Sequence, residues 1–544
     1  MKVACIQIAA YDLAHAENGL QRALEMVDEA GRSGADLIVL PECTYPAYFL
    51  KGIREYQKAR LRPWDELVAL FGGKAREYRC HIVVGLVEPA GGGRLCNVAA
   101  LFGPDGALLG STAKSFLWHF DQRWFSPGNE YRVFDTPIGR LGLLVCADGR
   151  MPEIARLMAL PRYLESSQSI GALQGAQVIV DATAWVTGGG DRETLTSPQF
   201  EYLIPVRALE NGVWFVVANK VGLEADSVLY CGRSCVIDPT GAKVVTASTD
   251  REEVLFADVD VGRATGIPAP RRPEAYSAIA QPTQSLPVAH LLDKELVPEK
   301  AVARIAALQL ADRPSANAFL ERVDGLLDTL SRQAVQLVVL PATLPADADG
   351  DAAEAGESAA LLARLSAAYG CGLAAMLMEY DCGLRYRTCF LWEAGNLVGK
   401  YRKVHQEDAG MAAGDSLAVF ETSIGRLGIM LDDEGLLPEV ARCLMLLGAD
   451  IILWPARESR WPLQMLARSR ADENRVHVVL ATPTGGGTAI VSATGGLMVA
   501  ALRDAEQAIA TQIPWMTSRY KEMAPHTDVV RSRVPNAYHW LVRR

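Results

Sequence analysis

The sequence feature that most restricts the fold of this chain is an internal repeat that runs through both halves. Three segments of the first half return in the same order in the second: Val133-Phe-Asp-Thr-Pro-Ile-Gly-Arg-Leu-Gly142 as Val419-Phe-Glu-Thr-Ser-Ile-Gly-Arg-Leu-Gly428, Asp36-Leu-Ile-Val-Leu-Pro41 as Gln336-Leu-Val-Val-Leu-Pro341, and Arg207-Ala-Leu-Glu-Asn211 as Arg470-Ala-Asp-Glu-Asn474. Segments that recur in a fixed order predict two copies of one folding unit. We expect the first unit to cover residues 1–276 and the second 301–544. Residues 277–300, which contain several prolines, are predicted to form a linker.

Within a unit, short apolar runs alternate with segments of helical periodicity. Leu20, Leu24, Val27 and Ala30 recur at helical spacing and predict a helix over residues 17–30. The predicted buried strands cover residues 3–8, 37–40, 82–86, 141–145, 178–180 and 213–218. Buried strands that are joined through helices indicate an α/β layered fold.

Composition narrows the class of partner. The net charge is −10 and no run of Lys and Arg stands out, so we expect a small-molecule substrate and no nucleic acid. The sequence lacks a run of about 18 apolar residues, and its start reads as a strand, so neither a membrane span nor a signal peptide is expected. Eleven scattered cysteines predict reduced thiols in a cytoplasmic protein, and no metal site.

Three candidate catalytic residues of the first unit each stand where a strand is expected to end. Glu42 follows residues 37–41, Lys114 follows residues 107–113, and Cys146 follows residues 141–145. Each has an ordinary structural interpretation, as a cap, a surface charge or a packed thiol. Together, in this order, they indicate a catalytic site at strand ends. We expect a helix to begin soon after Cys146, and its N-terminus would lower the pKa of the thiol.

These residues sit in longer motifs that resemble the nitrilase, or carbon–nitrogen hydrolase, superfamily. The motifs are Leu-Pro-Glu42, Lys114, Cys-Ala-Asp148 with Pro-Glu153, Arg207-Ala-Leu-Glu-Asn211, and Gly232-Arg-Ser-Cys-Val-Ile-Asp-Pro-Thr-Gly241. The resemblance covers Met1 to about Tyr276. It implies an αββα sandwich for each unit, with the two units packed face to face as an internal pseudo-dimer and further homo-oligomerisation left open.

The resemblance also implies a role for each residue. Cys146 would be the nucleophile that forms a thioester, and Glu42 the general base. Lys114 and the backbone N–H of Ala147 would stabilise the oxyanion. No metal or organic cofactor is implied.

The first unit departs from the family pattern at two places. The usual Tyr-Arg-Lys is Thr112-Ala113-Lys114 here, and Asp121 stands where the family has a second glutamate. Because Asp is one methylene shorter, both a catalytic and a structural role for Asp121 stay open.

The second unit lacks the reactive groups. Ala342 aligns with Glu42 and Asp432 with Cys146, whereas Lys403 aligns with Lys114. We therefore expect no thioester chemistry there and a structural role as partner of the first unit. Other chemistry at Asp432 and Asp433 is the less favoured alternative.

The residues after the cysteine bear on the substrate. Cys-Ala-Asp148 is typical of amidases and carbamoylases rather than nitrile hydrolases, and the motifs are most similar to N-carbamoyl-amino-acid amidohydrolases. Of that group's two arginines only Arg150 is present, as Gly149 takes the other place; Arg150 would hold a substrate carboxylate or pair with a carboxylate of the fold. Trp185 would line the pocket or belong to the core.

The favoured function is hydrolysis of a linear amide or N-carbamoyl compound (EC 3.5.1), releasing ammonia or an amine. The alternatives are a nitrile hydrolase on the same triad and a non-catalytic binding protein.

Overall fold

The contacts within the chain define two units that each contain one copy of the repeat. The computed structural model describes residues 1–166, 169–173, 175–187, 191, 194–292, 301–311, 315–342, 352–406, 408–457 and 460–543. The first unit comprises Met1–Pro268 with Ala524–Thr527, and the second comprises Ala269–Met523 with Asp528–Arg544. No helix in these described ranges is both long and apolar enough to cross a membrane.

The boundary between the units lies earlier than residue 276, and part of the expected linker is helical. Helices α6 (Ser277–Ala280) and α7 (Pro287–Leu292) belong to the second unit. Ile279 and Val288 on these helices are buried. Tyr276 is fully buried, and its hydroxyl lies 2.6 Å from Nε2 of His405 in the same unit. The closing segment of the first repeat therefore packs in the second unit, while residues 293–300 lie outside the described ranges.

The first unit contains two sheets. The strands of one are β1 (Lys2–Ala9), β2 (Leu37–Val39), β3 (His81–Ala90), β4 (Arg94–Phe102), β5 (Leu108–Ala113), β12 (Lys220–Glu224), β13 (Val228–Cys231) and β16 (Glu253–Asp258). Their order is β13-β12-β1-β2-β3-β4-β5, and β16 pairs with β1. The strands of the other are β6 (Val133–Thr136), β7 (Gly139–Val145), β10 (Val178–Ala182), β11 (Trp214–Ala218), β14 (Cys235–Ile237) and β15 (Lys243–Thr246), in the order β15-β14-β11-β10-β7-β6.

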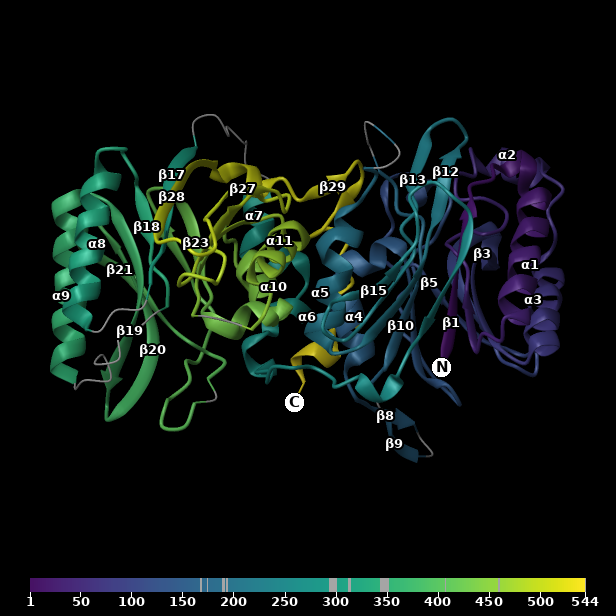
Figure 1. Cartoon of the computed structure of the whole chain (residues 1–544), viewed down its shortest axis with the longest axis horizontal. Coiled ribbons are helices and arrows are strands. Elements are labelled where there is room, and N and C mark those ends of the chain that lie inside the picture. Colours follow the sequence, from purple (N-terminus) through teal and green to yellow (C-terminus); the bar gives the residue numbers. More distant parts are fainter. Residues whose placement is uncertain are drawn as a thin grey trace. The chain divides into compact units, whose positions relative to one another are not determined.

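Helices cover the outward faces of these two sheets and complete four layers. Helices α1 (Ala16–Arg32) and α3 (Trp64–Tyr78) lie on the sheet that contains β1 and β3, and α4 (Pro152–Ala159) and α5 (Ile204–Asn211) lie beside the other sheet (Figure 1). β1 contacts β11 and β3 contacts β10, so the sheets pack face to face. Leu20 and Val27 of α1 and Phe71 of α3 are buried in one apolar cluster with the first sheet. This is the predicted αββα arrangement.

Three smaller elements of the first unit lie outside these layers. They are α2 (Ile53–Lys58) and the hairpin of β8 (Arg162–Ser166) with β9 (Ser169–Leu173).

The second unit repeats this architecture. The strands of its first sheet are β17 (Val302–Gln309), β18 (Leu337–Val339), β19 (Gly372–Asp381), β20 (Leu384–Glu393), β21 (Asn396–Arg402) and β28 (Gln507–Pro514). Those of its second are β22 (Val419–Thr422), β23 (Gly425–Ile429), β24 (Ile451–Pro455), β25 (His477–Ala481), β26 (Ala489–Val491) and β27 (Leu497–Ala500). The covering helices are α8 (Ala316–Ser331), α9 (Ala352–Tyr369), α10 (Pro438–Leu446) and α11 (Leu463–Asn474). In Figure 1, α8 and α9 lie against the sheet that contains β19 and β21.

The repeated Arg-x-x-Glu-Asn motif has a structural explanation. Arg207 is fully buried on α5, pairs with Glu210 at 2.7 Å, and donates to the backbone oxygens of Gly149 and Arg150. Arg470 on α11 pairs with Glu473 at 2.7 Å and donates to the backbone oxygen of Gly435. In both units a buried arginine thus ties a helix to the turn that follows the central strand. Buried ion pairs of this kind need such extra hydrogen bonds to offset the cost of desolvation.

His477 of β25 gives the second unit a predicted sensitivity to acid. Its ring is buried and its Nε2 lies 2.9 Å from Oγ1 of Thr517, and burial lowers its pKa to about 4. Between pH 6.5 and 4 the unfolded chain binds a proton that the folded chain does not. Stability is therefore lost as pH falls through this window, by roughly 3 kcal/mol. His477→Asn should remove this part of the pH dependence.

Urea unfolding monitored at pH 7 and pH 4.5 checks this expectation. The variant should lose less stability than the wild type between the two pH values, and the exposed control His539→Asn should lose as much as the wild type. An equal loss in wild type and His477→Asn would refute the assignment.

Candidate active site

A buried chain of three charged residues lies at the strand ends of the first unit. Lys114 follows β5, and its Nζ is 2.7 Å from Oε1 of Glu42 and 2.7 Å from Oδ2 of Asp121. All three side chains are fully buried. Burial disfavours the ammonium charge, but Asp121 and Glu42 outweigh it and raise the pKa of Lys114 well above its ordinary value. Lys114 is therefore a fixed cation held between two carboxylates.

Cys146 follows β7 in a left-handed backbone conformation, with φ of 49°. It begins a short 3-10 turn, η4 (Cys146–Arg150), and its backbone N–H donates to Oδ1 of Asp181 at 2.9 Å. Its backbone oxygen accepts from Nε2 of Gln199, also at 2.9 Å. A non-glycine residue with this φ is strained, so both hydrogen bonds help to hold the turn in place.

The expected lowering of the thiol pKa is wrong for this structure. Helix α4 begins only at Pro152, after η4, so Cys146 is not in the first turn of that helix. Burial raises the pKa of Cys146 well above its usual value, and Glu42 raises it further. Lys114 and the hydroxyl of Thr183 act in the opposite direction on this pKa. A pKa in this range means that the thiol is protonated at neutral pH.

Asp148 joins the segment after Lys114 to the segment that carries the thiol. Its Oδ1 accepts the backbone N–H groups of Ser115 at 3.0 Å and Phe116 at 2.8 Å, and its Oδ2 accepts that of Val145 at 3.3 Å. Burial raises the pKa of Asp148 to about 7. The aspartate of the Cys-Ala-Asp motif is thus a brace between the segment after Lys114 and the segment that leads to Cys146.

Asp121, whose role the sequence left open, contacts Lys114 directly. It belongs to the short helix η3 (His119–Arg123), and its Oδ2 also accepts the backbone N–H of Trp118 at 2.9 Å. Oδ1 of Asp121 has no hydrogen-bond partner among the described residues. Asp121 therefore reaches Lys114 in spite of its shorter side chain.

Arg150, Gly149 and Trp185 were the positions expected to bear on substrate binding. The guanidinium of Arg150 stacks on the indole of Trp118 at 4.7 Å. A side chain at Gly149 would have its Cβ 2.5 Å from Cδ1 of Ile204, so the place of the missing arginine is narrow. Trp185 is buried, with its backbone N–H donating to Oδ1 of Asn219 at 2.8 Å. Its place in a substrate pocket stays a prediction.

Sequence reasoning missed three residues of the site. Asn97 donates to Oε1 of Glu42 at 2.6 Å, and Asp181 and Gln199 hold the backbone of Cys146. Asn97 and Asp181 are polar residues within otherwise apolar strands, β4 and β10. That signal was available, because a buried polar group in a strand needs a partner.

The second unit keeps the backbone frame of this site without its reactive groups. The N–H of Ala342 donates to the oxygen of Ala456 at 3.2 Å, as that of Glu42 does to Thr183. Asp432 has φ of 50° at the position of Cys146. No thiol lies at this turn, so the expected absence of the Glu–Cys pair holds at these positions.

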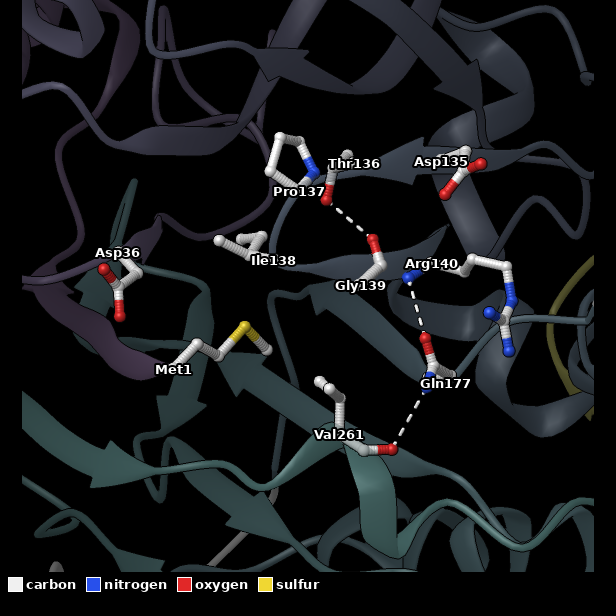
Figure 2. A pocket seen from close by; sticks show the side chains of 10 residues that line it. All are labelled: Met1, Asp36, Asp135, Thr136, Pro137, Ile138, Gly139, Arg140, Gln177 and Val261. Atoms are coloured by element: carbon white, nitrogen blue, oxygen red, sulfur yellow. Dashed lines mark hydrogen bonds between the residues drawn. The ribbon is translucent and has the colours of Figure 1, made fainter.

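A surface hollow of about 490 Å³ lies at the N-terminal ends of β2 and β7 (Figure 2). It is lined by Asp36, which precedes β2, and by Gly139 and Arg140, where β7 begins. Gln177 spans it, accepting from the backbone N–H of Arg140 at 3.2 Å and donating to the oxygen of Val261 at 3.2 Å. Glu42 and Cys146 lie beyond the opposite ends of β2 and β7, so this hollow is separate from the candidate active site.

Comparison with known proteins identifies the family. The model of the carbon–nitrogen hydrolase family matches residues 2–269 and again 304–521. The chain belongs to the carbon–nitrogen hydrolase family. The double match confirms the predicted tandem repeat of this family's domain.

Relatives of this carbon–nitrogen hydrolase align with about half of the chain. The omega-amidase NIT2 of Bos taurus is 31% identical over 44% of this chain and 83% of its own length. The nitrilase of Pyrococcus abyssi is 31% identical over 48% of this chain and 90% of its own. A solved amidase structure from Nesterenkonia sp. is 25% identical with a TM-score of 0.39, covering 48% of this chain and 90% of that one.

Proposed function

We propose that the first unit hydrolyses the C–N bond of a small amide or N-carbamoyl compound through a thioester on Cys146. The observation that carries this proposal is the buried Glu42–Lys114–Asp121 chain at the strand ends, whose charges act on the protonated thiol. A raised thiol pKa is compatible with catalysis because Glu42 provides the base.

The reaction would run in two halves. Glu42 takes the proton of the thiol as sulfur attacks the carbonyl carbon, and the carbonyl oxygen becomes an oxyanion. Lys114 and the backbone N–H of Ala147 stabilise that oxyanion. The C–N bond breaks as Glu42 returns the proton to the leaving nitrogen, leaving the thioester. Glu42 then takes a proton from water, which attacks the thioester. The C–S bond breaks as Glu42 returns this proton to sulfur, which restores the thiol and releases a carboxylic acid, or a carbamic acid that decomposes.

Asp121 would act on Lys114 rather than on the substrate. With one oxygen on Lys114 and on the N–H of Trp118, it fixes the position of the ammonium relative to the turn of Cys146. A fixed cation stabilises the oxyanion without rearrangement at the moment of reaction.

The substrate class rests on the residues around the turn and on the relatives. Curated relatives include proteins named omega-amidase and one named nitrilase, so amides are favoured and nitriles are the second candidate. Arg150 is proposed to hold a substrate carboxylate, because it follows the turn of Cys146 and a guanidinium matches a carboxylate in charge and shape. Trp185 is proposed to bound the acyl side of the pocket.

An ammonia-release screen tests the function. Purified protein and its Cys146→Ala variant would be offered simple amides, N-carbamoyl amino acids, N-carbamoyl amines and nitriles. We expect release from an amide or a carbamoyl compound by the wild type and by the control Cys382→Ala, whose cysteine is exposed. Release by Cys146→Ala at the wild-type rate, or from no compound with any protein, would refute the proposal. Release from nitriles alone would select the second candidate.

A further inference from the structure

The second unit preserves the strained turn of the site but surrounds it with different charges. Asp432, in the position of Cys146, is held by its backbone oxygen, which accepts from Nε1 of Trp454 at 2.9 Å. In the first unit Gln199 gives the corresponding hydrogen bond to Cys146. In the second unit, therefore, a different side chain donates the hydrogen bond that holds this turn.

The site in the second unit has two arginines at positions where the first unit has other residues. Arg387 aligns with Asn97, because the backbone oxygen of each accepts the backbone N–H of the aligned lysine, Lys403 or Lys114, at 2.8 Å. Arg457 aligns with Ala184. Nη1 of Arg387 lies 3.6 Å from Oδ2 of Asp432. Nε of Arg457 lies 3.3 Å from the same oxygen.

Lys403 completes a group of three cations around this carboxylate, with Nζ 3.9 Å from Oδ2 of Asp432. The side chains of Arg387, Lys403 and Asp432 are 10%, 4% and 5% exposed. We call Arg387, Lys403 and Arg457 the cationic triad. Arg457 is 45% exposed, so the cost of burying a charge, which is large unless the charge is paired, falls on Arg387 and Lys403.

The remaining counter-charges lie at the edge of the group. Asp408 is 2.5 Å from Nη2 of Arg387 and 49% exposed, and Asp433 is 2.5 Å from Nζ of Lys403 and 43% exposed. Without these two carboxylates, three cations face one buried carboxylate, an excess of two positive charges. Nη1 of Arg387 and Oδ2 of Asp432 have no hydrogen-bond partner among the described residues.

We propose that the cationic triad is a binding site for a small carboxylate anion, whose carboxylate takes the place of Asp408 or Asp433. The exposed carboxylates of Asp408 and Asp433 already pair with Arg387 and Lys403, so the positions of these cations suit a carboxylate. A phosphate dianion would be repelled more strongly by Asp432 at the centre of the triad. The second unit would thus bind a ligand at the turn where the first unit binds its substrate.

Calorimetric titration of the full chain tests the proposal, with propionate and glutarate as probes and inorganic phosphate as comparison. Carrying Cys146→Ala in every protein makes the result independent of the proposed reaction. We expect saturable carboxylate binding that is about 10–100-fold weaker in Arg457→Gln, because a charge-assisted pair is lost. The control Arg503→Gln changes an exposed arginine that donates to the backbone oxygen of Gly485, and it should bind as tightly as the parent. Arg150→Gln removes the proposed carboxylate site of the first unit, so it should abolish binding there and leave the affinity of the triad unchanged.

Asp433→Asn provides the opposite test. It removes a carboxylate that competes for Lys403, so the probe should bind several times more tightly than to the parent. Binding that is absent from the parent, unchanged in both Arg457→Gln and Asp433→Asn, or lost in Arg150→Gln would overturn the proposal. Absence from the parent would show a closed ion-pair cluster that fills the site.

Discussion

Glu42→Gln is expected to lower kcat/KM for the preferred amide by about a thousandfold. Burial and the nearby carboxylate charge hold the pKa of the Cys146 thiol well above its usual value, so almost no thiolate forms without a base. Glutamine keeps the shape of Glu42 and an oxygen for Asn97 and Lys114, but it cannot take the proton. The loss should therefore fall on the chemical step and spare the fold.

Steady-state kinetics would measure this effect. Turnover should slow in Glu42→Gln and should not change in the control Glu88→Gln, whose carboxylate accepts from Ser111 on the same sheet. A fall of less than tenfold in kcat/KM would mean that another group takes the proton.

Asp181 is expected to position the backbone of Cys146, and two replacements of Asp181 should therefore have different effects. Asp181→Ala should lower kcat by about a hundredfold with little change in KM, because the N–H of Cys146 loses its acceptor and the strained turn shifts. Asp181→Asn should stay within about tenfold of the wild type, because its amide oxygen can accept the same hydrogen bond. Burial raises the pKa of Asp181 well above its usual value, so its surroundings disfavour the charge that Asp181→Asn removes.

Measurement of kcat, KM and the pH–rate profile of both variants would decide the role. If Asp181→Ala does not fold, the near-normal activity of Asp181→Asn still separates a hydrogen-bond acceptor from a required charge. Equal and large losses in the two variants, with a shifted pH profile, would make the charge of Asp181 essential and contradict the positioning role.

The sequence predicted the layers, and it singled out the candidate site residues, because both leave local signals. Apolar runs predicted β1, β2 and β7. The turns that follow the second and third of these runs contain Glu42 and Cys146. Asn97 and Asp181 gave a signal as buried polar residues in strands, but no spacing along the chain reveals that they meet Glu42 and Cys146, or that Gln199 meets Cys146. The thiol pKa was mispredicted for a related reason: a helix was expected close to Cys146, and the extent of burial is set by tertiary packing.

The boundary at Pro268 could not be inferred from motifs either. Tyr276 ends a motif of the first repeat, yet its hydroxyl meets His405, far away in sequence. The predicted pairing of the two units and the substrate roles of Arg150 and Trp185 stay predictions.

The brace formed by Asp148 has a counterpart in Glu434, which accepts the backbone N–H groups of Leu431, Val404 and His405. Both units therefore keep a carboxylate that fastens the turn to the neighbouring loop, although only one unit keeps the thiol. Support and reactivity reside in different side chains, so mutation can change one without the other. A protein engineer could use the same separation, altering residues 342, 387, 432 and 457 to install new chemistry on a support that is already in place.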